Sequence, residues 1–285
     1  MKTNILLLGS NSFAATGLLQ KLTLDGFNVD IFARGKEGRS ENIVSGDIMD
    51  LSANKYLNTS YDIIINFILI KDSDVTENIC FAKELIMCCE NKKVNHLIHI
   101  SSISVYPNNL EYVNEESLIE ADYNSKGVYA AKKVAVDNYL TSTSNKNLHI
   151  SYVRPGFILS NDRKPPLTGI LKRLPLNFGL LLGNKKTTLP VVEREIFQKS
   201  IIKILNLDQH VEVHLILNNS TKYKFIKKAY NYRIITLPKR FILVLANVSL
   251  RIGIFSKKQV VQISGLFKTT VFDPSKTETN LKIRF

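Results

Sequence analysis

Apolar runs of strand length alternate with helical patterns through the first half of the chain. Buried strands are expected at 2–8, 28–33 and 62–68, from 94 to the hydroxyl-rich end at 101–104, and at 149–153. Helical patterns occupy 16–24, 75–90 and the segment around Tyr129. Strands that each lead into a helix are typical of an α/β fold. The alternation ends at Arg154 and Pro155, so we predict a doubly wound parallel sheet with a smaller C-terminal lobe.

Charge divides the chain into unlike halves. Residues 1–150 carry 14 Lys and Arg against 18 Asp and Glu, a net charge of −4, whereas residues 151–285 carry 24 against 7, a net charge of +17. A basic half suits an anionic small-molecule ligand, because it attracts the ligand at long range and pairs with it directly. An anionic membrane face is an alternative. No recognisable nucleic-acid-binding module surrounds the charges, so we expect no nucleic-acid partner.

Metal chemistry is not expected from this sequence. The three cysteines, Cys80, Cys88 and Cys89, fall in one predicted helix without the paired spacing of metal ligands. The five histidines form no cluster with carboxylates. Residues 5–8 run directly into a glycine turn, with no charged leader and cleavable apolar segment before them. We therefore expect a cytoplasmic protein with reduced thiols.

Tyr129 and Lys133 are one helical turn apart, so both side chains lean over the same face of a helix. The spacing alone is weak, because Tyr223 and Lys227 repeat it. Only the first pair follows a strand that ends in hydroxyls, among them Ser102. A phenol has a pKa of about 10, and a neighbouring lysine is expected to lower it. With Ser102 holding a substrate oxygen, the three groups suit proton transfer coupled to hydride transfer at a C–O centre.

These residues resemble the extended branch of the short-chain dehydrogenase/reductase superfamily, which contains nucleotide-sugar epimerases, dehydratases and reductases. The run 101–106 resembles the family's Ser-Ser-x-x-Val-Tyr, with Ser102 in the catalytic place, and Tyr129 and Lys133 match its Tyr-x-x-x-Lys. Arg154 and Pro155 match the Arg-Pro after the next strand. The resemblance implies Ser102, Tyr129 and Lys133 as catalytic residues, with Lys133 also orienting the nicotinamide ribose. An ordinary buried strand beside an amphipathic helix is the alternative.

A cofactor site is expected at the first glycine turn. The family's loop is Gly-x-x-Gly-x-x-Gly, and here Gly9 is followed by Ser12 and Ala15 at the other two positions. Unpaired N–H groups at the helix start would face a phosphate. The resemblance implies these cofactor contacts: Gly9, Ser12, Phe13, Ala15, Arg34, Asp47, Ile48, Tyr129, Lys133 and Pro155.

Arg34 bears on which nicotinamide cofactor is used. A dinucleotide-binding fold usually places an acid at the end of the second strand, where it binds the adenosine ribose. This chain has Ala33 followed by Arg34, and an arginine can accept a 2′-phosphate. NADP(H) is therefore favoured over NAD(H), unless the register places Asp30 at the ribose. Asp47, in a Gly-Asp-Ile run, is a candidate for the adenine edge, with a plain surface turn as the alternative.

The resemblance also divides the chain into domains. It implies a nicotinamide-cofactor domain over 1–155 and a mainly substrate-binding lobe over 156–285, with 190–217 returning to the main sheet. The implied function is reduction of a keto group on a nucleotide sugar, in polysaccharide biosynthesis. The dehydratases carry acids directly after the catalytic hydroxyl, where this chain has Ile103 and Ser104. An epimerase with the same three residues remains an alternative, as does a non-catalytic cofactor-binding sensor. A homodimer is a candidate assembly.

The stretch 238–255 is apolar nearly all round and flanked by Lys239, Arg240, Lys257 and Lys258. It is shorter than the roughly 20 residues of a membrane-spanning helix. We expect it to be a core helix of the C-terminal lobe. The alternative is a helix lying on an anionic membrane surface.

Overall fold

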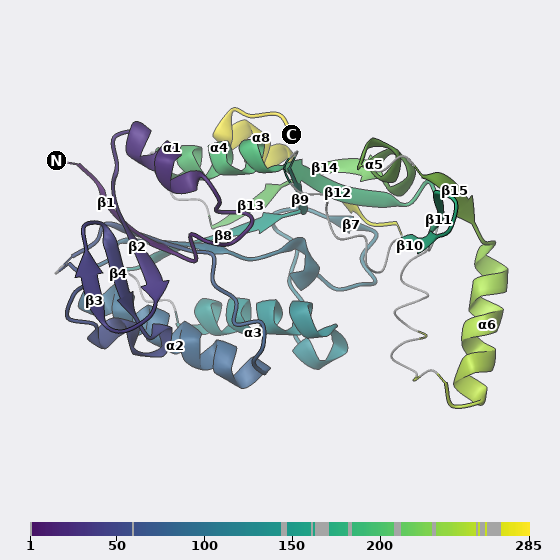
Figure 1. Ribbon diagram of the computed structural model, residues 1–285, viewed down its shortest axis with the longest axis horizontal. Coiled ribbons are helices and arrows are strands. Elements are labelled where there is room, and N and C mark those ends of the chain that lie inside the picture. Colours follow the sequence, from purple (N-terminus) through teal and green to yellow (C-terminus); the bar gives the residue numbers. More distant parts are fainter. Residues whose placement is uncertain are drawn as a thin grey trace.

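A parallel sheet forms the centre of the computed structural model (Figure 1). The structure describes residues 2–58, 60–143, 147–160, 162, 171–181, 184–207, 212–229, 232–254, 256, 260 and 269–285. In spatial order the strands of the sheet are β13 (Val213–Ile216), β8 (His149–Pro155), β6 (His96–Ile100), β5 (Ile63–Asn66), β1 (Asn4–Leu8), β2 (Asn28–Arg34), β4 (Ile43–Gly46) and β3 (Gly38–Ser40). Each pairs in parallel with its neighbour except β3, which is antiparallel to β4. The predicted doubly wound parallel sheet is confirmed.

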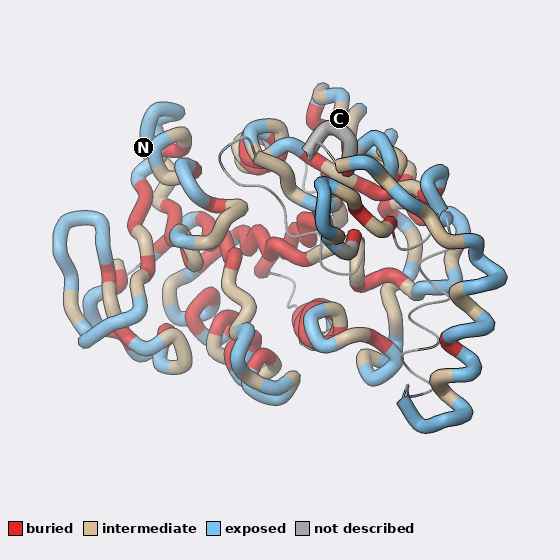
Figure 2. Tube along the Cα trace, turned by 45° about the vertical axis from the view of Figure 1, so that its right-hand side comes forward, coloured by how far each residue is buried: buried red, intermediate tan, exposed pale blue. Residues whose placement is uncertain are grey.

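Helices cover both faces of this sheet. Figure 1 shows α2 (Val75–Asn91) and α3 (Val128–Thr143) on one face, and α1 (Leu18–Leu24), α4 (Arg194–Leu205) and α8 (Ser275–Leu281) on the other. Strands covered on both sides must be apolar throughout. Residues 5–8 of β1 are accordingly fully buried, and so is most of β5. Figure 2 shows this buried centre in red. Two apolar cores result, one on each face of the sheet.

The described part of the second lobe is built mainly from short strands. One sheet contains β10 (Leu171–Leu174), β11 (Phe178–Leu181) and β15 (Arg233–Thr236), and another contains β14 (Asn218–Thr221), β12 (Thr188–Glu193) and β9 (Phe157–Leu159). A two-stranded pair joins β16 (Val271–Phe272) to β7 (Tyr112–Val113). Among the described residues of this lobe, helices include α5 (Lys222–Ala229) and α6 (Lys239–Arg251). Short helical turns in the described residues include η1 (Ile48–Ala53), η2 (Ile103–Val105) and η3 (Tyr123–Ser125).

Three segments of the second half lie with the first lobe. Helix α4 packs its Phe197 and Ile201 into the core beside α1, and β13 extends the main sheet beyond β8. The last helix, α8, adds Leu281 to the same core. The main sheet is therefore covered by residues from both ends of the chain. Within the predicted segment 190–217, residues 208–211 lie outside the described residues.

Helix α6 is not the core helix that the sequence predicted. Of its residues, Ala246 is buried, while the apolar side chains on one side are exposed. Figure 2 shows the helix mostly in pale blue, at the edge of the molecule. The prediction was wrong because the sequence shows only that the helix is apolar on every side. It does not show which part of the fold, if any, covers each side of the helix. Lys257 and Lys258 lie outside the described residues. In the described part of the chain, no helix combines the length and the apolar character needed to cross a bilayer.

Candidate active site

The carboxyl end of the main sheet gathers most of the residues predicted for the site. Gly9 follows β1, Arg34 ends β2, and Asp47 follows β4. Ser102 lies two residues beyond β6, and Pro155 ends β8. Because these strands are parallel, all five positions lie along one edge of the sheet, where α/β proteins bind their ligands.

The turn after β1 requires glycine at Gly9. Its φ is 78°, in the left-handed region. A Cβ at this position would lie 3.1 Å from both Phe67 Cβ and Ile68 Cγ1, so there is also no room for a side chain. Phe67 packs edge-on against Phe197 with ring centroids 6.2 Å apart. Phe67 is thus accommodated on the α4 side of the sheet, whereas Ile68 packs against the core on the other side.

The helix after this turn begins later than predicted. The expected start was Thr16, but α1 begins at Leu18, because Gly17 has a φ of 87° and interrupts the helical path. The N–H groups of Ala15 and Thr16 both donate to the Ser12 carbonyl at 3.0 Å. They are therefore paired within the turn, and the predicted row of unpaired helix-start donors is not present at these two positions.

A glutamine from the second half of the chain holds the glycine turn in place. Gln198, on α4, is buried and donates from Nε2 to the carbonyls of Ala14 and Thr16, both at 2.9 Å. Beside it, the Arg194 guanidinium lies 5.2 Å from the centroid of the Phe13 ring. Sequence analysis missed both contacts, since 184 residues separate Gln198 from Ala14 and no local pattern marks the pairing.

Arg34 and Asp30 have different roles at β2. Arg34 is the last residue of the strand and is exposed. The Asp30 carboxylate is buried and accepts hydrogen bonds from three side chains: Arg39 at 2.8 Å, Asn58 at 2.8 Å and Tyr61 at 2.6 Å. These hydrogen bonds hold the Asp30 carboxylate inside the protein. The end of the strand is therefore occupied by Arg34 and not by an acidic residue.

Asp47 has a local structural role. Its Oδ1 accepts a hydrogen bond from the Met49 N–H at 2.9 Å and caps the short helix that begins at Ile48. The carboxylate is exposed beside this cap. The cap explains the aspartate without a ligand, which is the alternative that the sequence left open.

The Ser102 hydroxyl is oriented by its neighbour Ser104. Ser102 caps η2, and its Oγ accepts hydrogen bonds from both the Ser104 N–H, at 3.1 Å, and the Ser104 hydroxyl, at 3.0 Å. A hydroxyl oxygen has two acceptor positions and one proton to donate. With both acceptor positions filled, Ser102 is left with its proton to donate, and the Tyr129 hydroxyl is one acceptor within its reach.

Tyr129 lies in the first turn of α3 and is exposed, with a relative accessibility of 52 %. Partial desolvation raises its pKa above the ordinary value, while a hydrogen bond from Ser102 acts in the opposite direction and the charge of Asp137 adds to the rise. Desolvation is the largest of these effects, so the direction of the pKa shift is opposite to the lysine-driven fall that the sequence predicted. The Tyr129 hydroxyl is protonated at neutral pH, as an ordinary phenol is.

Lys133 points into the protein. Its ammonium donates to the Ile100 carbonyl at 2.5 Å, and the residue is only 3 % exposed. Burial lowers the pKa of Lys133 to about 8, and the nearby Asp137 carboxylate opposes this fall. The lysine therefore holds the end of β6, next to the serines.

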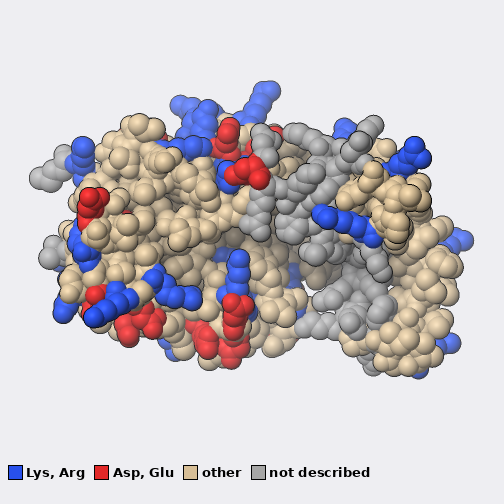
Figure 3. All heavy atoms as spheres, viewed as in Figure 1, with Lys and Arg blue, Asp and Glu red and all other residues tan. Residues whose placement is uncertain are grey.

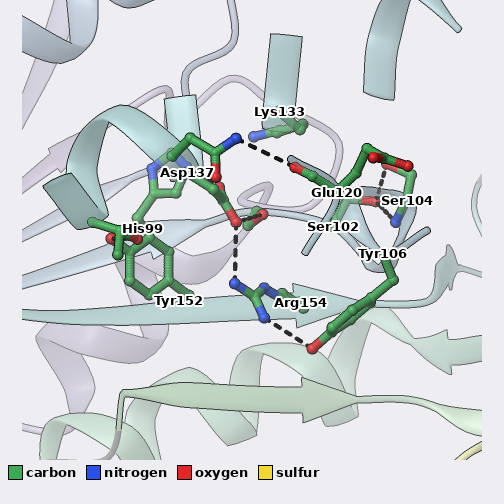
Figure 4. A network of polar contacts seen from close by, with 12 residues as sticks. His99, Ser102, Ser104, Tyr106, Glu120, Lys133, Asp137, Tyr152 and Arg154 are labelled. Atoms are coloured by element: carbon green, nitrogen blue, oxygen red, sulfur yellow. Dashed lines mark hydrogen bonds and ion pairs between the residues drawn. The ribbon is translucent and has the colours of Figure 1, made fainter. Parts of the chain in front are cut away.

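A buried carboxylate lies one turn beyond Lys133 on the same helix (Figure 4). Asp137 Oδ2 accepts from the Ser101 hydroxyl at 2.7 Å and from Arg154 at 3.4 Å, and Oδ1 is 3.4 Å from His99 Nε2. Burial alone would raise the pKa of Asp137, but the His99 hydrogen bond and the Arg154 charge hold it below its ordinary value. Asp137 is thus a charged residue at the centre of the first lobe.

The hydrogen bonds around His99 fix its tautomer. Asn66 Oδ1 accepts from the Ile68 N–H at 2.9 Å, so the Asn66 amide nitrogen faces His99 Nδ1 at 3.1 Å. Nδ1 must then accept, which leaves the ring proton on Nε2, facing Asp137. Burial lowers the pKa of His99, so the ring is neutral.

Arg154 connects this network to the loop that carries Ser102. Its guanidinium donates to the Tyr106 hydroxyl at 2.9 Å and lies 5.0 Å from the centroid of that ring. On the other side of the same loop, the Lys126 ammonium donates to the Tyr106 carbonyl at 2.5 Å. The hydroxyl-bearing loop is therefore held from both β8 and η3. Arg154 was identified in the sequence as part of the Arg-Pro pair, whereas Asn66, His99 and Asp137 were not.

The second lobe contains a cavity of about 480 Å³. It lies against β12 and β14, and its lining includes Lys224, Glu193 and the polar run 218–221. Ser102, Tyr129 and Lys133 are not among the lining residues. The cavity is therefore a feature separate from the three predicted catalytic residues. In the described part of the chain, no group of three or more His, Cys, Asp or Glu side chains is placed to hold a metal ion.

Comparison with known proteins identifies the class. Residues 5–174 match the model of the NAD dependent epimerase/dehydratase family, and this chain belongs to that family. The match spans the glycine turn and the Ser102, Tyr129 and Lys133 positions. The expected resemblance to extended short-chain dehydrogenases/reductases is confirmed. No curated protein sequence matches this chain.

Solved structures share the fold at low identity. A UDP-glucuronic acid 4-epimerase from Bacillus cereus in complex with NAD is 17% identical, with a TM-score of 0.67, 99% of this chain covered and 93% of that one. A human epimerase family protein with NADPH is 14% identical, with a TM-score of 0.65 and coverages of 99% and 95%. The terminal R domain of the myxalamid biosynthetic pathway is 15% identical, with a TM-score of 0.70 and coverages of 99% and 85%. At these identities the likeness supports the fold alone.

Proposed function

We propose that this protein is an NAD(P)-dependent oxidoreductase that reduces a keto group on a nucleotide-activated sugar. The observation that carries the proposal is that the two hydroxyls of the site are both hydrogen-bond donors. Ser102 has both acceptor positions filled by Ser104, and Tyr129 is protonated at neutral pH, as an ordinary phenol is. A substrate oxygen would accept the Ser102 proton in place of the Tyr129 oxygen. A carbonyl oxygen accepts two hydrogen bonds, so the pair suits a ketone that is becoming an alcohol.

The chain's own residues would then divide the work. Ser102 orients the substrate oxygen, and Tyr129 donates the proton to it as the alcohol forms. Lys133 positions the end of β6 through the Ile100 carbonyl. When bound, the nicotinamide cofactor supplies the hydride. Contact of Lys133 with the nicotinamide ribose remains part of the proposal.

The carboxyl edge of the sheet fits a nicotinamide dinucleotide. The Gly9 turn follows β1 at this edge, and Arg34 is an exposed cation at the adjacent strand end. We propose NADP(H) as the preferred cofactor, with Gly9, Ser12, Phe13, Ala15, Asp47, Ile48 and Pro155 around it. The internal pairing of Asp30 supports this preference, because Arg39 and Tyr61 hold its carboxylate inside the protein and not at the end of the strand.

Arg34→Ala tests the cofactor assignment. A charge-assisted hydrogen bond contributes about 1.5 to 3 kcal/mol, so the variant should lose most of the preference for NADPH, while its affinity for NADH stays nearly constant. Fluorescence titration of both cofactors against parent and variant measures this. Arg251→Ala, which removes an exposed guanidinium on α6, is the control and should leave the ratio unchanged. Equal affinity of the parent for both cofactors would refute the role of Arg34.

An epimerase using the same residues is the second candidate. The solved structures of UDP-sugar 4-epimerases with this fold favour it. Incubation with NADPH, NADH and a panel of keto and hydroxy nucleotide sugars separates the two. A reductase consumes cofactor in proportion to product, whereas an epimerase interconverts sugars without net consumption.

Tyr129→Phe is the matched test of the chemistry. Loss of a positioned general acid reduces the rate by roughly a hundredfold or more, while cofactor affinity should be retained. Tyr223→Phe repeats the change at the second Tyr-x-x-x-Lys match, in α5, and should be close to silent. Residual activity above about a hundredth of the parent in Tyr129→Phe would contradict the assignment. Cofactor binding without turnover of any sugar would favour a non-catalytic sensor.

A further inference from the structure

We propose that α6 docks this protein on an anionic membrane surface. The first observation is a stripe of exposed apolar side chains along one side of the helix. Its members have relative accessibilities between 47 and 64 % and are Phe241, Val244, Leu245, Val248 and Ile252. They follow one another at intervals of three or four residues, which places them on a single helical face.

The opposite side of α6 is the one that packs against the protein. Ala246 is buried, and Ile242, Ser249 and Leu250 are half-buried. A surface helix normally turns its apolar side inward and its polar side outward. Here the inward side is already apolar and the outward side is apolar as well. The outward stripe therefore has no role in packing this lobe.

Charge identifies what would cover the stripe. Between Glu212 and Asp273 the sequence contains no acidic residue, although Lys and Arg recur throughout it. On α6 itself, Arg240 and Arg251 are exposed and lie along one edge of the stripe, because they are one turn before and two turns after Val244. Figure 3 shows the acidic side chains of this view over the first lobe and the centre, with only basic ones beside α6.

An apolar stripe bordered by cations matches the boundary between lipid headgroups and acyl chains. Helices with this pattern lie in the interface, with the apolar face buried about 5–10 Å below the headgroups and the basic residues paired with anionic lipids. With 13 residues, α6 is about 20 Å long, which is less than the roughly 30 Å of a hydrocarbon core. It would therefore lie in the membrane plane and not across it.

The position of α6 suits this role. Figures 1 and 2 both show the helix at the edge of the second lobe, projecting from the rest of the molecule. Among the described residues no element lies over the stripe, so a bilayer can reach it there. A second copy of the chain fits less well, because two stripes brought together would also bring together two acid-free basic segments, which repel each other.

The test uses a tryptophan probe, because the chain contains no tryptophan. Val248→Trp places an indole in the stripe, and Leu118→Trp places one at an exposed apolar position of the first lobe as the control. Vesicles of phosphatidylcholine with phosphatidylglycerol should shift the emission of Val248→Trp to the blue and shield it from a soluble quencher. The control should not respond. An unchanged Val248→Trp spectrum would overturn the proposal.

Charge and apolar contributions are then separated by flotation with the same vesicles. Arg240→Gln/Arg251→Gln should weaken binding roughly thirtyfold, since each basic residue near an anionic surface contributes about 1 kcal/mol. Val244→Glu/Val248→Glu should abolish flotation, whereas Leu24→Glu/Leu118→Glu should not. Equal binding to vesicles of phosphatidylcholine alone would overturn the anionic requirement. A concentration-dependent blue shift of Val248→Trp without vesicles would overturn the proposal in favour of a second copy.

Discussion

Helices α3 and α6 both depart from the rule that a surface helix buries apolar side chains and exposes polar ones, and they do so in opposite directions. In α3, Lys132, Lys133 and Asp137 are buried, whereas Tyr129 is exposed. In α6 an apolar stripe is exposed, and the single buried residue is Ala246. Each arrangement costs free energy in the isolated chain, because buried charges and exposed apolar surfaces are both unfavourable.

The difference lies in where the compensating partners are. Every buried charge of α3 has a partner in the chain: Lys132 donates to the Lys71 carbonyl, Lys133 to the Ile100 carbonyl, and Asp137 pairs with Arg154. For the stripe on α6, the described residues supply no such cover. We interpret the buried charges of α3, which are paired within the chain, as part of the proposed active site. We interpret the exposed apolar stripe of α6 as a surface for a partner outside the chain.

Among the substitutions that test this comparison, removal of the Asp137 carboxylate should have the largest effect on the free energy of unfolding. Asp137→Ala leaves Arg154 as a buried cation without its partner, which typically costs 3–5 kcal/mol. The free energy of unfolding, measured with urea, should fall by about this amount. Asp72→Ala removes an exposed carboxylate and should change it by less than about 0.5 kcal/mol. A loss of under about 1 kcal/mol for Asp137→Ala would mean that the network is not held together by this charge.

Titration of Lys133 gives a smaller, pH-dependent effect. The pKa of Lys133 is lowered to about 8 in the folded protein, from the ordinary value of 10.5 for a lysine side chain. Below pH 8 the folded protein bears the full cost of burying the ammonium. Between about pH 8 and 10.5 the unfolded chain binds more protons than the folded one, so stability rises with pH. The gain is up to about 3 kcal/mol, from 1.36 kcal/mol per pKa unit.

The measurement compares parent and Lys133→Met across this window, so that other titrating groups cancel. The parent should gain stability relative to the variant as the pH rises from 7.5 to 10. Lys55→Met replaces an exposed lysine, and the difference in stability between the parent and this variant should not change with pH. A parallel dependence in Lys133→Met and parent would show that the ammonium is not buried.

The smallest effect on stability is expected on α6. Val244→Glu/Val248→Glu places charges on the exposed stripe and should change the free energy of unfolding by less than about 0.5 kcal/mol. Ala246→Glu introduces the same charge on the buried side of the same helix and should cost several kcal/mol. Thermal unfolding of the two variants compares the faces. Unfolding of the double variant would show that the stripe is covered within the chain.

Much of the first lobe follows from the sequence, because its signals are local. Strands buried on both faces read as continuous apolar runs, as in residues 5–8, and parallel strands in sequence order place their ends on one edge. That reasoning brought Gly9, Ser102 and Tyr129 to the same end of the sheet. The sequence also predicted that β2 ends at residue 33, one residue before its observed end at Arg34.

Long-range contacts are what the sequence could not show. The spacing of Tyr129 and Lys133 predicts a shared face but not the rotation that turns Lys133 inward to Ile100. Asp137 continues the same one-turn spacing, so the signal was present, but its partners His99 and Arg154 come from other strands. For α6, a pattern that is apolar on every side carries no information about which side is covered.

In the proposed reaction Tyr129 donates a proton to a keto sugar, held by Ser102, that receives a hydride. The most direct measurement follows deuterium from NADPH deuterated at both C4 positions into the sugar by mass spectrometry, with the oxidised cofactor quantified alongside. We predict one deuterium in the product for each NADPH oxidised, and no labelled product with Tyr129→Phe. Unlabelled epimer formed without cofactor oxidation, or equal labelling by Tyr129→Phe, would contradict the account.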